Sequence, residues 1–257
     1  MTRNSCNYQK AMDENASSFE GNLDEYLQWN VGVFPIEKNK KILDLGCGPG
    51  SYFKEIMKYE PSLYYATDYD EHFLNKTLSL FNGRSNCKAA ELDIMDQNAF
   101  ACLKGNEFDY VLCLDVLEHI EDHAAVLSSI HKIISNTGNG ILFLRVPAIQ
   151  SIYGENDRAI GHQRRYSAKY LRKILEECFF DVEIMRYQNI LGIIPWYLIG
   201  NVMKRKLAVS SIESKCFNLI VPFMRKVENI LPPPIGLSIY CVCTIKTRKV
   251  HPSLKYA

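Results

Sequence analysis

The chain has 257 residues, of which 47% are apolar and 23% are charged, and its formal net charge is +1. These values are ordinary for a globular protein. They exclude an intrinsically disordered chain and argue against a dedicated, strongly basic nucleic-acid-binding protein. The length suits one large α/β domain better than two full domains.

Charge is divided unevenly along the chain. Residues 1–200 hold 20 Lys/Arg and 27 Asp/Glu, whereas residues 201–257 hold 10 Lys/Arg and only 2 Asp/Glu. A basic C-terminal part can contact an anionic substrate or a membrane surface, and a solvated basic face is the alternative. The longest apolar run, residues 190–200, contains Pro195 and is too short to span a bilayer.

Nine Cys residues are scattered along the chain, and no two of them form a C-x-x-C pair. This usage is typical of a reduced protein and not of a disulfide framework or a zinc site. The N-terminal residues contain no apolar stretch of the kind found in secretory signals. We therefore expect a cytoplasmic protein, with peripheral contact at a membrane as an added possibility.

Strand-like and helical segments alternate over the first part of the chain. Apolar, β-rich runs predict strands at 40–46, 62–68, 87–93, 108–115 and 138–146. Helical stretches are expected between and after them, at 50–59, 71–81, 97–103 and 122–134. Such alternation predicts parallel strand pairing in a doubly wound sheet.

The pattern changes after Pro147, where a polar loop occupies residues 148–166. Ser167 is then expected to cap a helix at 168–178. Strands are expected at 180–187 and 238–246.

About fifty residues separate these last two strands, which is too long for a plain hairpin loop. Helical character at 195–207 and 211–229 predicts a helical cap over the sheet edge, with Pro195 and Pro222 as expected helix starts. We expect a single domain over residues 1–257. Its expected parts are an N-terminal helical segment, a cofactor-binding core, a cap insertion and a last strand, at 1–37, 38–188, 189–236 and 237–247.

A glycine-rich turn, DLGCGPG at residues 44–50, joins the first strand to the first helix. Glycines let a backbone contact a ligand closely, and the helix N-terminus offers free N–H groups. Dinucleotide-binding folds share this turn, so an NAD-dependent oxidoreductase is one alternative. Their fingerprint wants Gly or Ala where this chain has Ser51, and Asp44 would repel a pyrophosphate but attract an ammonium group. Asp68 can bind ribose hydroxyls in either case.

Four segments carry a resemblance to a known family. KILDLGCGPGS (41–51) resembles motif I of class I S-adenosylmethionine-dependent methyltransferases, and ATDYD (66–70) and ELDIMD (91–96) resemble their next two strand ends. FDYVLCLDVLEHIED (108–122) is similar to the segment after the fourth strand in ubiquinone-biosynthesis O-methyltransferases. The resemblance implies a Rossmann-like, seven-stranded sheet, mostly parallel with an antiparallel last strand, and helices on both faces.

The resemblance also implies S-adenosylmethionine as the cofactor and S-adenosylhomocysteine as its product. In it, Asp44 orders the turn and faces the ammonium group, Asp68 binds the ribose, and Asp93 with the Ile94 N–H reads the adenine. Asp44 or Asp93 could instead act as a cap, and Asp70 is expected to cap the next helix. The implied cofactor-binding residues are Asp44, Gly46, Cys47, Gly48, Gly50, Asp68, Tyr69, Asp93, Ile94, Leu114 and Asp115.

Methyl transfer from a sulfonium is an in-line displacement, so positioning is the main catalytic task, and a base is needed only when the acceptor must lose a proton. His119 and His162 are the candidate catalytic bases. In the similar quinone O-methyltransferases the pattern matching Asp115-x-x-Glu118-His119 can bind a divalent metal. We expect no metal here, because two carboxylates and one His only partly meet a hard cation's needs. Glu118 is a candidate substrate-binding residue. Glu118 and His119 could instead orient the loop.

The segment GHQRRYS (161–167) resembles a motif of uncharacterised bacterial methyltransferases linked to glycan or lipid modification. Arg164 and Arg165 could pair with a carboxylate or phosphate on the acceptor, and Tyr166 could form a pocket wall. A salt-bridged loop is the alternative. Trp29 and Trp196 could close the acceptor pocket, and core packing is the alternative for each.

These observations predict a methyltransferase that transfers a methyl group to an O or N atom of a small-molecule, glycan or lipid-linked acceptor. A methyltransferase-like binding module without catalysis is a further alternative. We expect no nucleic-acid partner, because the chain has no N-P-P-Y-like motif and no separate RNA-binding module. The oligomeric state stays open.

Overall fold

The computed structural model describes residues 24–96, 98–103, 105–135, 138–203 and 211–246. Seven strands form one sheet in the order β3-β2-β1-β4-β5-β7-β6. β7 pairs antiparallel with both of its neighbours, and the other pairs are parallel. The strands are β1 (Lys41–Leu45), β2 (Leu63–Asp68), β3 (Cys87–Glu91), β4 (Tyr110–Leu114), β5 (Ile141–Pro147), β6 (Phe180–Gln188) and β7 (Ser238–Ile245). This sheet confirms the predicted fold class.

The central strands are buried on both faces, which explains their nearly continuous apolar sequences. Every residue of β4 is buried, and only the first residues of β1 and β5 reach solvent. β3 lies at the sheet edge and none of its residues is buried, which accounts for its weaker sequence pattern.

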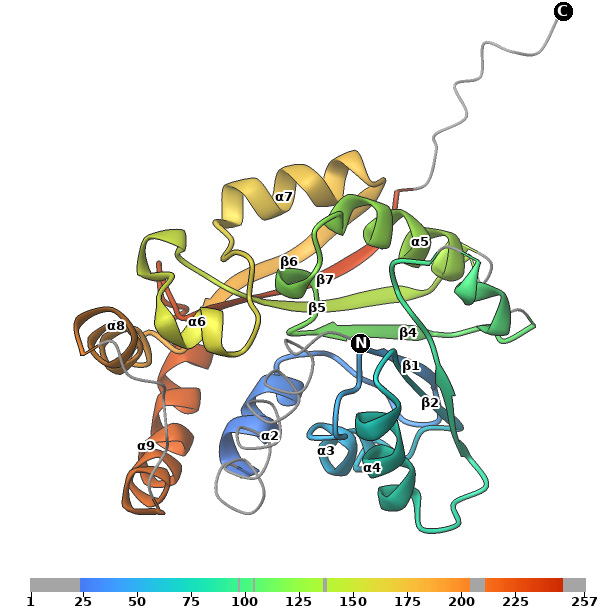
Figure 1. Cartoon of the computed structure of the whole chain (residues 1–257), viewed down its shortest axis with the longest axis horizontal. Helices are drawn as coiled ribbons and strands as arrows, with labels where there is room; N and C mark the ends of the chain where they lie inside the picture. Colours follow the sequence, from blue (N-terminus) through green and yellow to red (C-terminus); the bar gives the residue numbers. More distant parts are fainter. Residues whose placement is uncertain (1–23, 97, 104, 136–137, 204–210, 247–257) are drawn as a thin grey trace, which may run out of the picture.

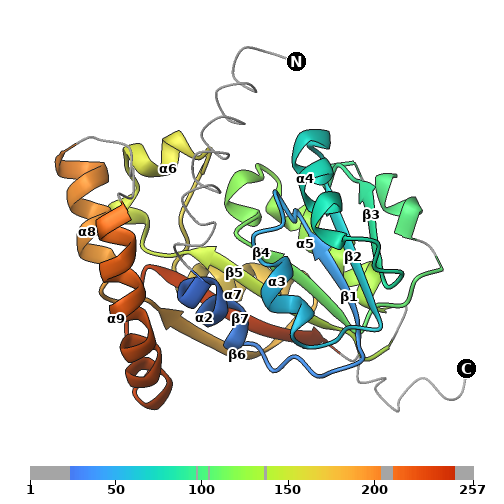
Figure 2. The ribbon, with the colours of Figure 1, turned by 90° about the horizontal axis from the view of Figure 1, so that it is seen from below.

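Helices cover both faces of the sheet (Figure 1). One face packs against α5 (His123–Ser135) and α7 (Ala168–Glu177), and the other against α3 (Phe53–Met57) and α4 (Glu71–Phe81). α2 (Asp24–Gly32) lies on the same side as α3 and α4 (Figure 2). The helices therefore form the two outer layers of a doubly wound fold.

Side-chain caps begin two of these helices as the sequence predicts. Asp70 accepts a hydrogen bond from the His72 amide at 2.9 Å, and Ser167 accepts one from the Tyr170 amide at 3.2 Å. Other helices differ from expectation. The first is shorter than predicted, and the helix expected at 97–103 is a 3₁₀ turn, η1 (Ala99–Leu103).

The segment expected as a polar loop contains two short helices, η3 (Gln150–Ile152) and α6 (Glu155–Ala159). The cap contains α8 (Ile193–Tyr197), a π-helical turn η4 (Leu198–Val202) and α9 (Ser211–Ile230). Some predicted segments lie partly outside the described residues. Among them are the N-terminal helical segment, the helix expected from residue 195 and the last strand, whose undescribed parts fall within 1–23, 204–210 and 247.

Pro195 lies in the first turn of α8, where its missing N–H costs no helical hydrogen bond. Pro222, predicted to start a helix, lies instead inside α9. That prediction was wrong because tertiary packing overrides the local break. Val221 and Met224, on either side of the proline, are buried against Trp29 of α2.

The cap begins and ends at the carboxyl edge of the parallel strands. Gln188, the last residue of β6, pairs with Ser238, the first residue of β7, and Ser238 also pairs with the last residue of β5. The Glu228 carboxylate of α9 accepts hydrogen bonds from the amides of Asn189 and Ile190 at 2.9 and 3.0 Å, which ties the end of the cap to its beginning. Open α/β sheets bind ligands at this edge.

Candidate active site

The glycine turn follows β1 at the carboxyl edge of the sheet. Gly46, Gly48 and Gly50 have φ of +68°, +54° and +82°, a backbone region that glycine adopts at little cost. A Cβ on Gly46 would lie 2.7 Å from a Val116 methyl, whereas a Cβ on Gly48 would meet nothing within 4 Å. The turn is thus packed against the chain after β4 on one side and open beside Gly48.

Asp68, at the end of β2, fixes this turn. Its Oδ2 accepts a hydrogen bond from the Gly48 amide at 2.8 Å, and its Oδ1 accepts one from the Asp70 amide at 3.0 Å. A carboxylate has about four lone-pair sites, so both oxygens keep acceptor capacity for two hydroxyl groups. Tyr69, the next residue, is 56% exposed.

Asp44 lies beneath the turn, near the end of β1, and is buried. Its Oδ2 accepts a hydrogen bond from the Tyr64 hydroxyl at 2.6 Å, so its side chain contacts β2 and does not cap a helix. Burial raises the pKa of Asp44 to about 6, and the Tyr64 hydrogen bond opposes that rise. The carboxylate is therefore mostly charged at neutral pH.

The remaining predicted cofactor residues lie at neighbouring strand ends. Cys47 and Leu114 are buried in the apolar cluster beneath the turn. Asp93 is exposed, and its Oδ1 accepts a hydrogen bond from the Met95 amide at 2.8 Å. This bond makes Asp93 a turn residue and leaves Oδ2 as the second acceptor. Ile94 packs on the core beside it.

Asp115 follows β4 and adopts φ +57°, which is uncommon for a residue other than glycine. Its Oδ2 pairs with Arg145 of β5 and accepts a hydrogen bond from the Tyr52 hydroxyl at 3.0 Å. The buried Arg145 also donates to Tyr26 of α2 at 2.6 Å and to Ser238 of β7 at 2.9 Å. These contacts hold Asp115 in its strained conformation.

Sequence reasoning missed Arg145 and Tyr52. Arg145 carried a usable signal, because a charged residue inside the apolar strand ILFLRVP requires a buried partner.

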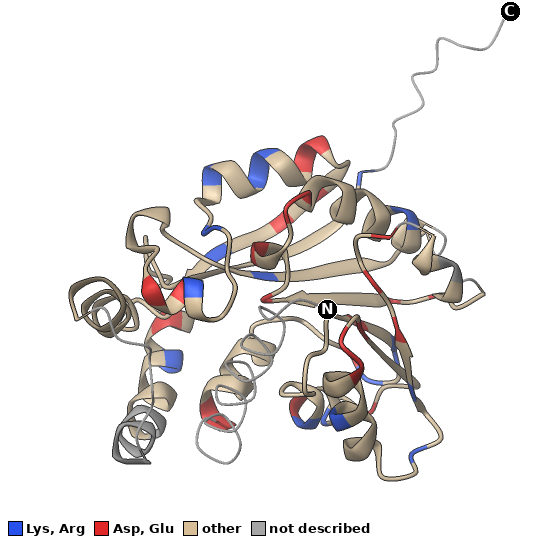
Figure 3. Ribbon diagram, in the orientation of Figure 1, with Lys and Arg blue, Asp and Glu red and all other residues tan. Residues whose placement is uncertain are grey.

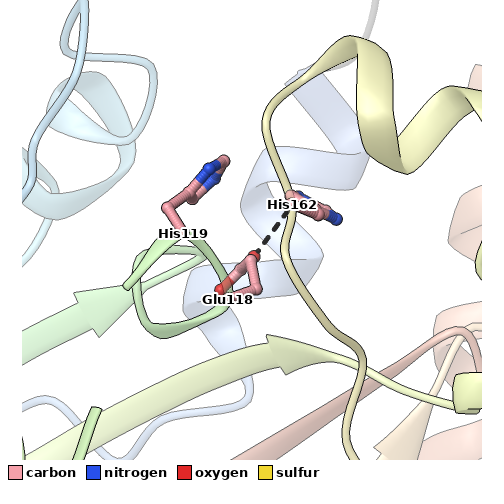
Figure 4. A group of neighbouring side chains, drawn as sticks. All are labelled: Glu118, His119 and His162. Atoms are coloured by element: carbon pink, nitrogen blue, oxygen red, sulfur yellow. Dashed lines mark ion pairs between the residues drawn. The ribbon is translucent and has the colours of Figure 1, made fainter. Parts of the chain in front are cut away.

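Next to Asp115, the short turn η2 (Leu117–His119) presents two of the predicted residues to the loop that carries His162 (Figure 4). Glu118 is fully buried, and neither of its carboxylate oxygens has a hydrogen-bond partner among the described residues. His162 Nε2 lies 3.6 Å from Glu118 Oε1. Burial, and then the charge of Asp115, raise the pKa of Glu118 well above its ordinary value.

His162 is oriented by Asp157 of α6, a fully buried residue that sequence reasoning missed. Asp157 accepts hydrogen bonds from His162 Nδ1 at 2.9 Å and from Arg165 Nε at 2.8 Å. Burial opposes ionisation of Asp157, but His162 and Arg165 together lower its pKa. A carboxylate only accepts, so Nδ1 of His162 carries the proton and Nε2 faces Glu118. No sequence signal marked Asp157, which lies in a segment expected as loop.

His119 lies beside His162, with ring centroids 4.9 Å apart and an interplanar angle of 76°. Its Nδ1 is 3.2 Å from the Gly161 carbonyl oxygen, which only accepts, so Nδ1 carries the proton. Burial, and then His162, lower the pKa of His119 to about 4. The His119 imidazole is therefore neutral at pH 7.

Other residues of the 161–167 segment make internal contacts. The buried Arg165 stacks over the Trp196 ring at 4.7 Å and pairs with Asp157. Tyr166 is fully buried in the core and donates to the Leu117 carbonyl at 3.1 Å, so it lies inside the protein and not on a pocket wall. Arg164 is half-exposed and donates to the Glu121 carbonyl at 3.1 Å.

The two tryptophans also have internal partners. Trp29 is 2% exposed and packs between α2 and α9, which is the core-packing alternative. Trp196 is half-buried beneath Arg165, and its Nε1 donates to Asp157 at 3.3 Å. Trp196 therefore supports the network that positions His162.

Comparison with known proteins relates this arrangement to one family. Residues 19–183, more than half of the chain, match the model of a methyltransferase domain. The ubiquinone biosynthesis O-methyltransferase of Thiobacillus denitrificans is 30% identical over 113 residues, which cover 44% of this chain and 47% of that protein. The chain thus matches about half the length of this relative.

Solved structures share the fold. One is the complex between the Haloferax volcanii Trm112 methyltransferase activator and a candidate methyltransferase, with a TM-score of 0.62, 14% identity, and coverage of 93% of this chain and 97% of that chain. Another is an S-adenosylmethionine-dependent methyltransferase from Mesorhizobium loti, with a TM-score of 0.56, 11% identity, and coverage of 84% and 95%.

Proposed function

The chain belongs to the methyltransferase-domain family of class I S-adenosylmethionine-dependent enzymes, and we propose that it methylates an O or N atom of an acceptor bound at the carboxyl edge of its sheet. The cofactor, when bound, supplies a methyl group that is already activated on a sulfonium. The protein's tasks are therefore to hold the cofactor, to orient the acceptor, and to remove the acceptor's proton where it has one.

The bond from the Gly48 amide to Asp68, with open space beside Gly48, carries this proposal. It brings a carboxylate with spare acceptor sites to an accessible stretch of backbone. Asp68 would bind the ribose hydroxyls, and Asp44 would face the ammonium group. Asp93 with the Ile94 amide, beside Tyr69, would bind the adenine.

Leu114 and Asp115 would lie at the sulfonium end, which puts the acceptor beside Glu118, His119 and His162. An imidazole nitrogen can accept a proton, so His119 and His162 are the proposed catalytic residues. Arg164, half-exposed beside this group, is the proposed contact for an anionic part of the acceptor.

Calorimetry with S-adenosylmethionine, S-adenosylhomocysteine and NAD tests the cofactor. We expect both sulfur compounds to bind, and Asp68→Asn to weaken their binding by about tenfold or more, because hydrogen bonds to a charged group contribute about 1.5–3 kcal/mol. Glu107→Gln, an exposed change at the opposite edge of the sheet, is the matched control. Binding of NAD alone would favour the oxidoreductase alternative. Cofactor binding without methyl transfer to any extract-derived acceptor would favour a binding module.

We further propose that the acceptor has an apolar or anionic part, as in a lipid-linked molecule. We also propose that the cap makes peripheral contact with a membrane surface. α9 carries an exposed apolar stripe at helical spacing, in which Leu219, Phe223 and Ile230 are 81%, 67% and 85% exposed. The described part of α8 carries no charged residue (Figure 3). Among the described residues, no helix is long and apolar enough to span a membrane.

Co-sedimentation with vesicles of anionic phospholipid at low salt tests the membrane contact. We expect binding by the intact chain and loss of binding in the Leu219→Glu/Phe223→Glu variant, which leaves the buried face of α9 unchanged. Absence of binding by the intact chain would remove this part of the proposal and leave the cofactor part untouched.

A further inference from the structure

The side chains beside the proposed acceptor position have the composition of a metal site. We propose that Glu118, His119 and His162 bind one divalent transition-metal ion through one carboxylate oxygen and two imidazole nitrogens. One ligand atom from each residue lies within 4.8 Å of the others (Figure 4). Binding of the ion is independent of the proposed function. With the ion bound, both Nε2 atoms are coordinated, so His119 and His162 act as ligands and not as bases, and the role of the ion in catalysis rests on the proposed function.

The spacing of these donors suits a metal after small side-chain adjustments. Ligand atoms bound tetrahedrally at about 2.0–2.2 Å from an ion lie about 3.5 Å from one another. His162 Nε2 and Glu118 Oε1 are already 3.6 Å apart, which is too long for a hydrogen bond and close to this separation. The pair is therefore spaced for a shared ion and not for direct contact.

Outer contacts orient both imidazoles in the manner of metal ligands. A ligating His generally donates its other ring N–H to a carboxylate or a backbone carbonyl. Here Nδ1 of His162 donates to Asp157 at 2.9 Å, and Nδ1 of His119 faces the Gly161 carbonyl at 3.2 Å. Both contacts make Nε2 the coordinating nitrogen of its ring. Asp157 is itself held by Arg165 and the Gly154 amide, so the orientation of His162 is rigid.

The buried carboxyl group of Glu118 also indicates a bound cation. Its side chain is fully buried, and both carboxylate oxygens lack a hydrogen-bond partner in the described part of the chain. An unsatisfied buried carboxyl group is costly, and a bound cation removes that cost. Among the described residues Glu118 makes no ion pair with an arginine, although the charges of Arg145 and Arg165 act on it from a greater distance.

This donor set differs from the one that the Asp115-x-x-Glu118-His119 pattern suggests. Asp115 is taken up by Arg145 and Tyr52, and the third donor is His162, from a loop outside the pattern. Two imidazoles and one carboxylate suit Zn²⁺, Mn²⁺, Fe²⁺ or Co²⁺ better than Mg²⁺ or Ca²⁺, which prefer oxygen ligands. The sequence pattern offers one His and two carboxylates, whereas this set offers two imidazoles and one carboxylate.

A cation held by three protein ligands keeps open positions. It would supply Lewis acidity toward an acceptor oxygen and so lower the pKa of an acceptor hydroxyl. The inference thus favours an acceptor that offers a hydroxyl or another oxygen next to the methylated atom.

The test uses the full chain, freed of metal with a chelator and then titrated with Co²⁺ and Zn²⁺ in a calorimeter. We expect one ion per chain, visible Co²⁺ absorption bands of a nitrogen- and oxygen-ligated ion, and a higher thermal midpoint with Zn²⁺. Glu118→Gln and His162→Asn should each weaken binding by at least tenfold. Asp157→Asn should weaken it about 10–100-fold through the orientation of His162.

His131→Asn, on α5 outside this group, is the matched control and should bind Co²⁺ like the unchanged chain. Circular dichroism of each variant verifies folding, and Glu118→Gln keeps the size of the side chain. The proposal is overturned if the unchanged chain binds neither ion, or if Glu118→Gln and His162→Asn bind as tightly as the control. Calorimetry with S-adenosylmethionine on the metal-free chain reports the proposed function separately.

Discussion

The two halves of the candidate site are built in different ways. The cofactor half is made of backbone, with three glycines at positive φ and a strand-end carboxylate that binds a glycine amide. The acceptor half is made of buried side chains from η2, α6 and the 161–167 segment, held by Asp157. A backbone site is set by short stretches of sequence, whereas a side-chain site depends on segments that meet only in the folded chain. Substitutions should therefore separate the two halves.

The largest effect is expected at Arg145, the partner of Asp115. Arg145→Met should lower the free energy of unfolding by about 3 kcal/mol, because it leaves the partly buried Asp115 without its partner. Urea denaturation measures this loss. Lys38→Met breaks an exposed pair with Glu60 and should cost less than about 0.5 kcal/mol. Equal losses of unfolding free energy in the two variants would contradict a stabilising role of the pair between Arg145 and Asp115.

In the cofactor half, Gly46→Ala should cost about 2 kcal/mol or more, because it adds a Cβ at positive φ and 2.7 Å from Val116. Gly83→Ala, at φ +75° with nothing within 4 Å, should cost only about 1 kcal/mol. Adding Val116→Ala to Gly46→Ala should restore part of the stability. No recovery would show that the backbone angle alone accounts for the loss.

In the acceptor half, Asp157→Asn should cost about 1–3 kcal/mol, because Arg165 and His162 lose a charged acceptor. Affinity for S-adenosylmethionine should stay within about twofold of the unchanged chain, since no residue assigned to the cofactor contacts Asp157. Stability from denaturation and affinity from calorimetry test the two statements separately. A large loss of cofactor affinity would mean that the halves are coupled.

The smallest effect is a pH dependence from Asp44. Its pKa is raised to about 6, so the carboxylate becomes neutral as pH falls and loses its attraction for the cofactor's ammonium group. Affinity for S-adenosylmethionine should fall about fourfold between pH 7.5 and 5.5. Tyr64→Phe removes a hydrogen bond that stabilises the charged form, and should move this fall to higher pH. A flat profile for the unchanged chain would argue against contact between Asp44 and the ammonium group.

The Asp44 carboxylate also makes stability depend on pH, and the sign is opposite to that of cofactor affinity: stability falls as pH rises. Its folded-state pKa lies above its unfolded value, so its contribution to stability is fully present below the unfolded pKa and is lost as pH rises through about 6. Binding and stability measurements across this window therefore distinguish a ligand contact from a purely structural role.

The sequence was sufficient for the elements whose signals are local. Strand alternation, the caps at Asp70 and Ser167, and the glycine turn with Asp68 all depend on neighbouring residues or on a fixed strand–helix order. Motif resemblance added the number of strands, their mostly parallel pairing and the antiparallel last strand.

Long-range features were not accessible in this way. Asp157 acquires its role only when α6 meets the 161–167 segment, and Tyr166 and Trp29 resemble pocket residues until their burial is known. Pro222 has the local signature of a helix start, but packing against α2 carries the helix through it. In each case a tertiary contact gives the residue a role that the local sequence does not determine.

The closure of the cap by Glu228 has a consequence for protein engineering. Because the insertion leaves and re-enters the sheet at paired residues, Gln188 and Ser238, its two attachment points are neighbours in space. The Glu228 carboxylate bridges them from within the insertion. Changes of length within the insertion are thus expected to leave the strand register unchanged, provided that Glu228 and the face of α9 that covers Trp29 are retained.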